Sequence, residues 1–273
     1  MDVVSYTAQW TAAIRARERD HGEHRLFEDA LAVAMAQPDG FDLLEKYKGG
    51  GVQEFVAIRT AYNVRAIVGL TRSEGLRQVV FIAAGMDTRA FRLDWPDRTR
   101  IFEVDHDALM AEKATRLQKL GAQPRADRIE VRADLALPWL EKLTDAGFDP
   151  AARTLWIAEG LLFFLEEHQV EDLLKTLRQV SAPGSFLITD MTSKALLRNP
   201  MTMMFLAKLR SDGTPWQFGT DDPVGFLEKC GWAAHEIQEP GETAFGPSRW
   251  PYPVQAKTQP GVPRSWLIQA RPA

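Results

Sequence analysis

Residues 78–85, QVVFIAAG, give the first indication of the fold. They form an apolar run of strand length that ends on small residues. Four similar runs follow: RIFEVD (100–105), RIEVRADL (128–135), TLWIAEG (154–160) and SFLITDM (185–191). Amphipathic stretches such as ALMAEKATRLQKL (108–120) separate them. This alternation predicts an α/β fold, a doubly wound and mostly parallel sheet with helices on both faces. WAAHEIQE (232–239) and SWLIQA (265–270) add two closing strands, which makes about seven.

The segments around this core predict a single domain with four parts. Residues 1–75 form an N-terminal helical extension, in which Pro38-Asp39-Gly40 is expected to end a helical run. Residues 76–190 form the core. Residues 191–220, rich in Met and aromatic side chains, interrupt the alternation and are expected to form a lid. Residues 221–273 supply a closing helix and the last strands.

Composition excludes several classes of protein. The 273 residues are 45% hydrophobic and 26% charged, with a net charge of -4, which provides no broad basic face and argues against nucleic acid as a partner. Cys230 is the one cysteine, so neither an internal disulfide nor a CxxC pair can form. The chain opens without a signal peptide and has no apolar stretch of membrane length. A soluble, cytoplasmic protein without membrane contact is expected.

The strand ends are where a ligand is expected in such a sheet. Gly85 closes the first strand, and Asp105 follows 20 positions later at the end of the next one. This is a nucleotide-type arrangement, although an ordinary turn is the alternative reading. The loop lacks G-x-G-x-x-G, so a phosphate-free nucleoside such as S-adenosylmethionine (SAM) fits better than a dinucleotide. Asp105, at a sheet edge facing a cleft, is not expected to support the core.

Two further strand ends carry acidic residues. Asp134 and Leu135 stand where an adenine edge would lie, a carboxylate for the amine and an apolar wall for the ring. Asp134 could instead cap the next helix. Glu159 interrupts the apolar run LWIAEGLLFFL (155–165), where a buried charge is costly without a partner. A ligand amine or a basic side chain is expected beside it.

In order and spacing, five stretches resemble the leucine carboxyl methyltransferase-like family of SAM-dependent methyltransferases. They are IAAGMDTRAFRL, IFEVDHDALMAEK, the Asp134-Leu135 pair, AEGLLFFL and VPRSWLIQARP. The resemblance implies a class I methyltransferase-like, Rossmann-like fold with SAM as the cofactor. It places Ala84 and Gly85 in the SAM loop, Asp105 on the ribose, and Asp134 with Leu135 on the adenine. Glu159 would lie near the methionine part and Arg59 on its carboxylate.

Two positions depart from the family pattern. Ala83 replaces the first glycine of LGAG, which is tolerable if its φ is negative. Phe164 stands where many members have a tyrosine, so a substrate hydrogen bond from that hydroxyl is missing. Phe164, Met203 and Met204 are the candidate substrate-binding residues, although a Met and aromatic cluster of this kind is more often core than pocket. No catalytic residue is assigned, and His21 with Glu23 and His24 reads as a charged helix rather than a metal site.

These observations predict a SAM-dependent O-methyltransferase that acts on a small-molecule acceptor. A carboxylate of a secondary metabolite or polyketide is favoured, because a carboxylate is ionised at pH 7 whereas a phenol would need a general base. A protein C-terminal carboxyl methyltransferase and a SAM-binding protein without methyl transfer remain the alternatives. A nicotinamide oxidoreductase is disfavoured by the glycine pattern.

Overall fold

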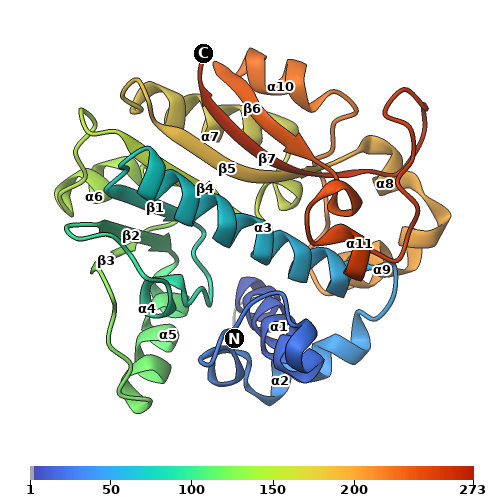
Figure 1. The fold of residues 1–273 in the computed structure, drawn as a ribbon, viewed down its shortest axis with the longest axis horizontal. Coiled ribbons are helices and arrows are strands. Elements are labelled where there is room, and N and C mark those ends of the chain that lie inside the picture. The colour runs from blue at the N-terminus through green and yellow to red at the C-terminus, as the bar shows by residue number, and fades with distance from the viewer. Residues whose placement is uncertain (1–2) are drawn as a thin grey trace.

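The strands of the described chain form one seven-stranded sheet in the order β3-β2-β1-β4-β5-β7-β6 (Figure 1). This computed structural model describes residues 3–273, with side chains from residue 7 onward. β1 pairs in parallel with β2 and β4, whereas β7 runs antiparallel to β5 and β6. The predicted mostly parallel sheet is confirmed. The strands are β1 (Gln78–Ile82), β2 (Arg100–Asp105), β3 (Asp127–Arg132), β4 (Thr154–Ala158), β5 (Phe186–Thr192), β6 (Trp232–Gln238) and β7 (Ser265–Pro272).

The strand order reverses between β1 and β4, which sets the place of the site. The chain runs outward from β1 through β2 to β3, then crosses back to β4 on the other side of β1. In open α/β sheets, ligands bind beyond the carboxyl ends of the strands at such a reversal. The loops after β1, β2 and β4 are therefore the structural framework of the site.

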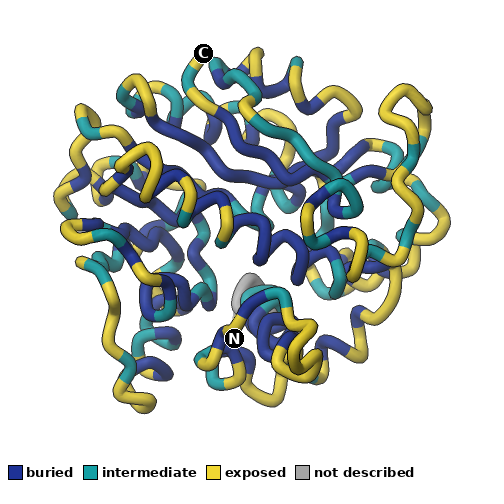
Figure 2. The backbone as a smooth tube through the Cα atoms, in the orientation of Figure 1, coloured by how far each residue is buried: buried dark blue, intermediate teal, exposed yellow. Residues whose placement is uncertain are grey.

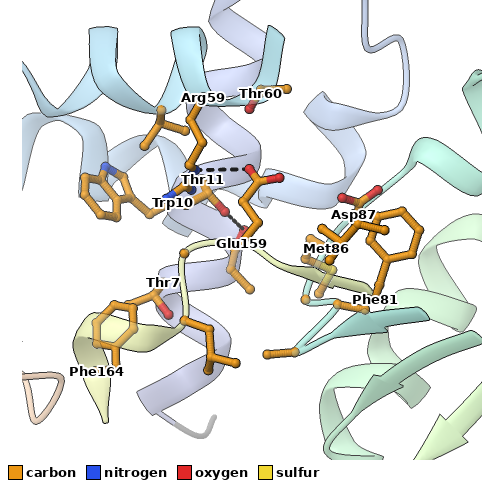
Figure 3. Close-up of a pocket in the computed structure, with 18 of the residues that line it drawn as sticks. Thr7, Trp10, Thr11, Arg59, Thr60, Phe81, Met86, Asp87, Glu159 and Phe164 are labelled. Atoms are coloured by element: carbon orange, nitrogen blue, oxygen red, sulfur yellow. Dashed lines mark hydrogen bonds and ion pairs between the residues drawn. The ribbon is translucent and has the colours of Figure 1, made fainter. Parts of the chain in front are cut away.

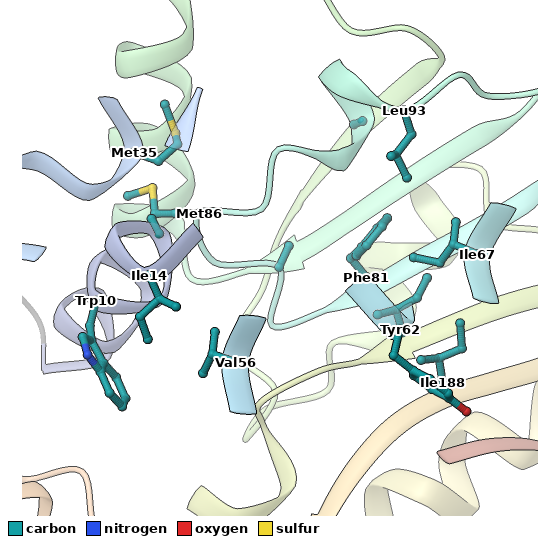
Figure 4. Packing of buried hydrophobic residues seen from close by; sticks show 14 of the residues in the cluster. Trp10, Ile14, Met35, Val56, Tyr62, Ile67, Phe81, Met86, Leu93 and Ile188 are labelled. Carbon is teal, nitrogen blue, oxygen red and sulfur yellow. The ribbon is translucent and has the colours of Figure 1, made fainter. Parts of the chain in front are cut away.

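Helices cover both faces of the sheet, and the alternation of side chains along β1 assigns each face its own core. Val79 and Phe81 belong to one core cluster with residues of α1, α2, α3, α4, α5 and α9, whereas Val80 and Ile82 belong to a second cluster with residues of α6, α7 and α10. Figure 4 shows part of the first cluster around Phe81. The inner strands β1, β4 and β5 are buried throughout, whereas the edge strands β3 and β6 are mostly half-buried (Figure 2). The helices are α1 (Val3–Arg17), α2 (Ala32–Lys46), α3 (Val52–Ser73), α4 (Arg89–Arg92), α5 (Asp107–Lys119), α6 (Leu140–Asp145), α7 (Glu167–Gln179), α8 (Lys194–Arg198), α9 (Pro200–Ser211), α10 (Pro223–Lys229) and α11 (Gly246–Arg249).

One N-terminal prediction is confirmed in part. The helical run before Pro38-Asp39-Gly40 ends as predicted, but a second helical segment follows directly and continues to Lys46, so α2 is two helical segments joined across a kink. The break falls at Gln37, whose φ of 57° is non-helical, and proline suits the first turn of the segment that follows. Gly40 is needed for packing, since a Cβ there would lie 2.5 Å from the carbonyl oxygen of Gln9 in α1.

The 191–220 segment also differs from the expectation. β5 extends to Thr192, and α8 and α9 follow it. Phe205 and Leu209 of α9 are buried against the core, whereas Met203 and Met204 are 59% and 75% exposed. Helical spacing explains this, because residues four apart share one face and leave the intervening residues on the other. Within the part of the chain that the structure describes, no helix has the length and apolar character needed to cross a membrane.

Candidate functional site

A cavity lies at the carboxyl ends of β1, β2 and β4, where the strand order reverses. Its walls are the loop 81–87, Asp105, residues 157–164, one face of α3 and one face of α1. Figure 3 shows Arg59 of α3 and Glu159 at the end of β4 pointing toward each other, with Thr7, Trp10 and Thr11 of α1 on the adjoining wall. The N-terminal helices thus contribute directly to the cavity, where Arg59 of α3 was the one residue of this region predicted from the sequence and the residues of α1 were not.

Asp105 is held by backbone groups at the edge of this cavity. Its Oδ2 accepts from the backbone N–H of Gly85 at 2.6 Å, and its Oδ1 accepts from that of His106 at 2.7 Å. Burial raises the pKa of Asp105, although these hydrogen bonds oppose the shift. The predicted pairing of Gly85 with Asp105 at neighbouring strand ends is therefore present. Asp105 also fixes the loop after β1, a structural role that the expectation about the core did not include.

Ala83 is strained at the start of the loop. Its φ is +54°, so the condition under which alanine is tolerable at this position, a negative φ, is not met. The left-handed region costs a non-glycine residue roughly 1–2 kcal/mol because Cβ approaches the backbone. The glycine typical of the family would relieve this strain.

We expect Ala83→Gly to stabilise the protein by about 0.5–1 kcal/mol, because relief of the strain exceeds the entropy that glycine adds to the unfolded chain. For a chain of this size, that change raises the melting temperature by about 1–4 °C. Ala84→Gly is the matched control: Ala84 is not among the described residues with positive φ, so this glycine should destabilise. A lower melting temperature for Ala83→Gly would contradict the reading.

Glu159 lies between two arginines, as its position in an apolar strand predicts. Its Oε1 accepts from Arg59 Nε at 3.1 Å, and its Oε2 accepts from Asn63 Nδ2 at 2.8 Å and from Arg89 Nη2. Burial raises the pKa of Glu159, but Arg89 and Arg59 outweigh burial and lower it to about 2. Glu159 is therefore ionised throughout the physiological pH range.

Arg59 is shared between two carboxylates. Its Nη1 donates to Asp190 Oδ2 at 3.0 Å, and the backbone N–H of Gly160 donates to Asp190 Oδ1 at 2.7 Å. Gly160 has a φ of +67°, and a Cβ there would lie 3.0 Å from the Arg59 guanidinium. Because Gly160 has no side chain, the Arg59 guanidinium can lie against the end of β4.

Asp134 and Leu135 lie beside the cavity rather than on its wall. β2 and β3 pair in register at Asp105 and Arg132, which places Asp134 at the same sheet edge as Asp105. Asp134 Oδ1 accepts from the backbone N–H of Ala136 at 2.8 Å, so it stabilises a turn and does not cap α6, which begins later at Leu140. Neither residue is among those that line the cavity.

Aromatic side chains form the other wall. Phe164 lines the cavity together with Phe163 and Trp216, whose ring centroids lie 4.1 Å apart. The backbone N–H of Gln217 donates to the Phe163 carbonyl at 2.6 Å and fixes the Trp216 segment against this turn. Met203 and Met204, the other candidate substrate residues, point to solvent on α9 and are not among the lining residues.

Arg89, Asn63 and Asp190 were not among the site residues predicted from the sequence. Asp190 could have been predicted in the same way as Glu159, because it is also a charged residue that interrupts an apolar strand, SFLITDM. Arg89 and Asn63 have no comparable local signal, since each lies in a helical segment and meets Glu159 only in the folded chain. Among the described residues, no group of three or more His, Cys, Asp or Glu is arranged to hold a metal ion.

Comparison with known proteins identifies relatives over most of the chain. Residues 8–178 match the leucine carboxyl methyltransferase family. A relative from Streptomyces avermitilis, named as a SAM-dependent methyltransferase, is 36% identical over 251 residues, covering 85% of each chain. A relative of the same designation from Streptomyces coelicolor is 37% identical over 245 residues, also covering 85% of each chain.

Solved structures with low sequence identity share the fold. A DUF574 family protein from Streptomyces avermitilis superposes with a TM-score of 0.65 at 15% identity, covering 98% of this chain and 97% of that one. Magnesium protoporphyrin IX methyltransferase from Synechocystis, solved with bound S-adenosylhomocysteine (SAH), gives a TM-score of 0.50 at 14% identity over 86% of this chain and 95% of that one.

The strand order and these superpositions define the fold of the class I SAM-dependent methyltransferases. Within that class, the chain belongs to the leucine carboxyl methyltransferase family.

Proposed function

We propose that the protein is a SAM-dependent O-methyltransferase that methylates a carboxylate of a small-molecule acceptor, such as a secondary metabolite or polyketide. The observation that carries this proposal is the composition of the cavity wall. Among the described residues that line it, there is no histidine, lysine, cysteine or tyrosine to act as a general base. An acceptor that is ionised by itself fits such a site.

The charged groups of the cavity match the chemistry of SAM. The Asp105 carboxylate suits ribose hydroxyls, the Glu159 carboxylate suits an α-ammonium, and the Arg59 guanidinium suits an α-carboxylate. Asp134 and Leu135, at the neighbouring strand end, are proposed to flank the adenine. When bound, SAM supplies a methyl group activated by its sulfonium. The names of the family relatives support the same cofactor.

Protein groups already engage the three carboxylates on the wall. Because its pKa is about 2, Glu159 holds a proton weakly, and its oxygens already accept from two arginines and an asparagine. Each Asp105 oxygen accepts a backbone N–H, and Asp87 accepts from the Arg89 backbone N–H and pairs with Arg89 Nη1. A phenol with a pKa near 10 would have to lose its proton without help, whereas a carboxylic acid is already ionised at pH 7.

The remaining task of the protein is to orient the acceptor and exclude water. Phe163, Phe164 and Trp216 offer an apolar wall against which the body of an acceptor can pack. Helix α1 adds Thr7, Ala8 and Thr11 to the lining of the cavity. Positioning and desolvation of an ionised nucleophile are the main requirements of an in-line methyl transfer.

A panel of matched acceptors tests this proposal. A carboxylic acid, a phenol and an alcohol on the same scaffold are incubated with SAM, and the products are followed by mass spectrometry before and after mild base. We expect methylation of the acid alone, with a product that base hydrolyses back to the acid, as an ester requires.

Three outcomes would contradict the proposal. A base-stable product from the phenol or alcohol would show ether formation. Methylation of a peptide C-terminus in preference to every small acid would indicate a protein substrate. Binding of SAH without any methylated product would point to a SAM-binding protein without transfer.

A further inference from the structure

Arg89 contacts Glu159 but does not itself line the cavity. It is 2% exposed, and it begins α4 immediately after the loop that follows β1. Its Nη2 donates to Glu159 Oε2, and its Nη1 lies 3.4 Å from Asp87 Oδ2. The lining residues include Glu159 and Asp87 but not Arg89. Arg89 can therefore affect a ligand only through these two carboxylates.

The contact joins two parts of the site that are distant in sequence. Gly85 lies in the loop that precedes Arg89, and its backbone N–H donates to Asp105 at the nucleoside end of the cavity. Glu159 follows β4, on the other side of β1 in the sheet. Arg89 follows the first loop in the chain and contacts Glu159 with its side chain. It therefore connects the nucleoside end of the cavity with the end at Glu159.

We propose that Arg89 is a positioning residue that holds Glu159 in the orientation and charge state needed to bind the α-ammonium of the cofactor. This inference rests on the proposed function, because it takes SAM as the ligand. Glu159 Oε1 stays with Arg59 Nε, while Oε2 is fixed by Arg89 together with Asn63. Arg59 cannot replace Arg89, because Asp190 also engages its guanidinium.

Loss of Arg89 has a predictable effect on Glu159. Burial raises the pKa of this carboxyl, and Arg89 is the foremost of the groups that lower it. Without Arg89, the pKa of Glu159 rises, so the carboxylate becomes protonated at a higher pH than in the native protein. A protonated Glu159 loses its ionic attraction for an ammonium group.

The experiment compares two ligands that differ only at the methionine end. SAH carries the amino acid, whereas 5′-methylthioadenosine has the nucleoside and thioether but no amino acid. For Arg89→Gln, we expect SAH affinity by calorimetry at pH 7 to fall about 10- to 150-fold, the range for one hydrogen bond to a charged group, with 5′-methylthioadenosine affinity unchanged. SAH affinity of the variant should also weaken further as the pH falls, in a range where the native protein does not change.

Two variants separate positioning from folding. Arg89→Lys keeps the charge and should restore part of the SAH affinity. Arg92→Gln, on the same helix, removes contacts to Thr88 and Asp29 but none to Glu159, so the ratio of the two affinities should stay native. Equal loss of both ligands in Arg89→Gln, or loss of neither, would overturn the inference. Failure of the native protein to bind either ligand would instead overturn the proposed function.

Discussion

Glu159→Ala is expected to destabilise the protein by about 3–5 kcal/mol, because removing one partner of a buried ion pair leaves charges uncompensated. Here the Arg59 and Arg89 side chains, 5% and 2% exposed, both lose their shared carboxylate. Methyl transfer should fall below detection, since the proposed contact to the cofactor ammonium disappears with it. Chemical denaturation and an activity assay measure the two effects.

Glu228→Ala is the control for this variant. Glu228 is an exposed residue of α10, and its replacement should change stability by no more than about 0.5 kcal/mol. If Glu159→Ala were equally mild, the cluster around Glu159 could not be the buried ionic centre described above.

The destabilisation should depend on pH with a definite sign. The pKa of Glu159 is about 2 in the folded protein against an ordinary value of 4.5, so its contribution to stability is complete above about pH 4.5. That contribution is lost as the pH falls from about 4.5 toward 2. The difference in unfolding free energy between the native protein and Glu159→Ala should shrink over that window, and a difference that grows there would contradict the assignment.

Asp105→Asn is expected to weaken SAH binding by about 10- to 150-fold, because an amide gives up charge-assisted acceptance from the ribose hydroxyls, worth about 1.5–3 kcal/mol. The variant should also lose about 1–3 kcal/mol of stability. An asparagine oxygen can accept from Gly85 or from His106, but its NH₂ group would face the other backbone N–H.

Calorimetry with SAH and thermal melting of the free protein follow these two effects. Thr220→Ala is a useful comparison for melting, because its hydroxyl accepts from the Asp222 backbone N–H away from the cavity. SAH affinity should stay native in this variant. Near-normal SAH affinity in Asp105→Asn, together with a large drop in melting temperature, would show that Asp105 is structural alone and that the ribose site lies elsewhere.

Much of the fold could be predicted because strand alternation is a local signal. The apolar runs, their small or acidic ends and the two closing strands all lie within short windows of sequence, and the sheet confirms them. Glu159 was also open to prediction, since a charge inside an apolar strand requires a partner. That argument predicted a ligand amine or a basic side chain beside Glu159, without naming Arg89.

The parts of the site that could not be predicted depend on contacts between residues far apart in the chain, which local sequence patterns do not encode. Arg89 and Glu159 are 70 positions apart, and only the crossing from β1 to β4 brings them together. The positive φ of Ala83 is set by the loop as a whole and departs from what alanine favours alone. Met203 and Met204 were misplaced because apolar composition does not say which face of α9 meets the core; Phe205 and Leu209 take that face.

Calorimetric titration of the native protein with SAH and, separately, with NAD is the most direct test that the cavity binds SAM. We expect saturable binding of SAH at one site per chain and no heat from NAD. The reason is that the loop after β1 supplies one glycine, bonded to Asp105, and no pyrophosphate cradle. Saturable binding of NAD without binding of SAH would contradict it.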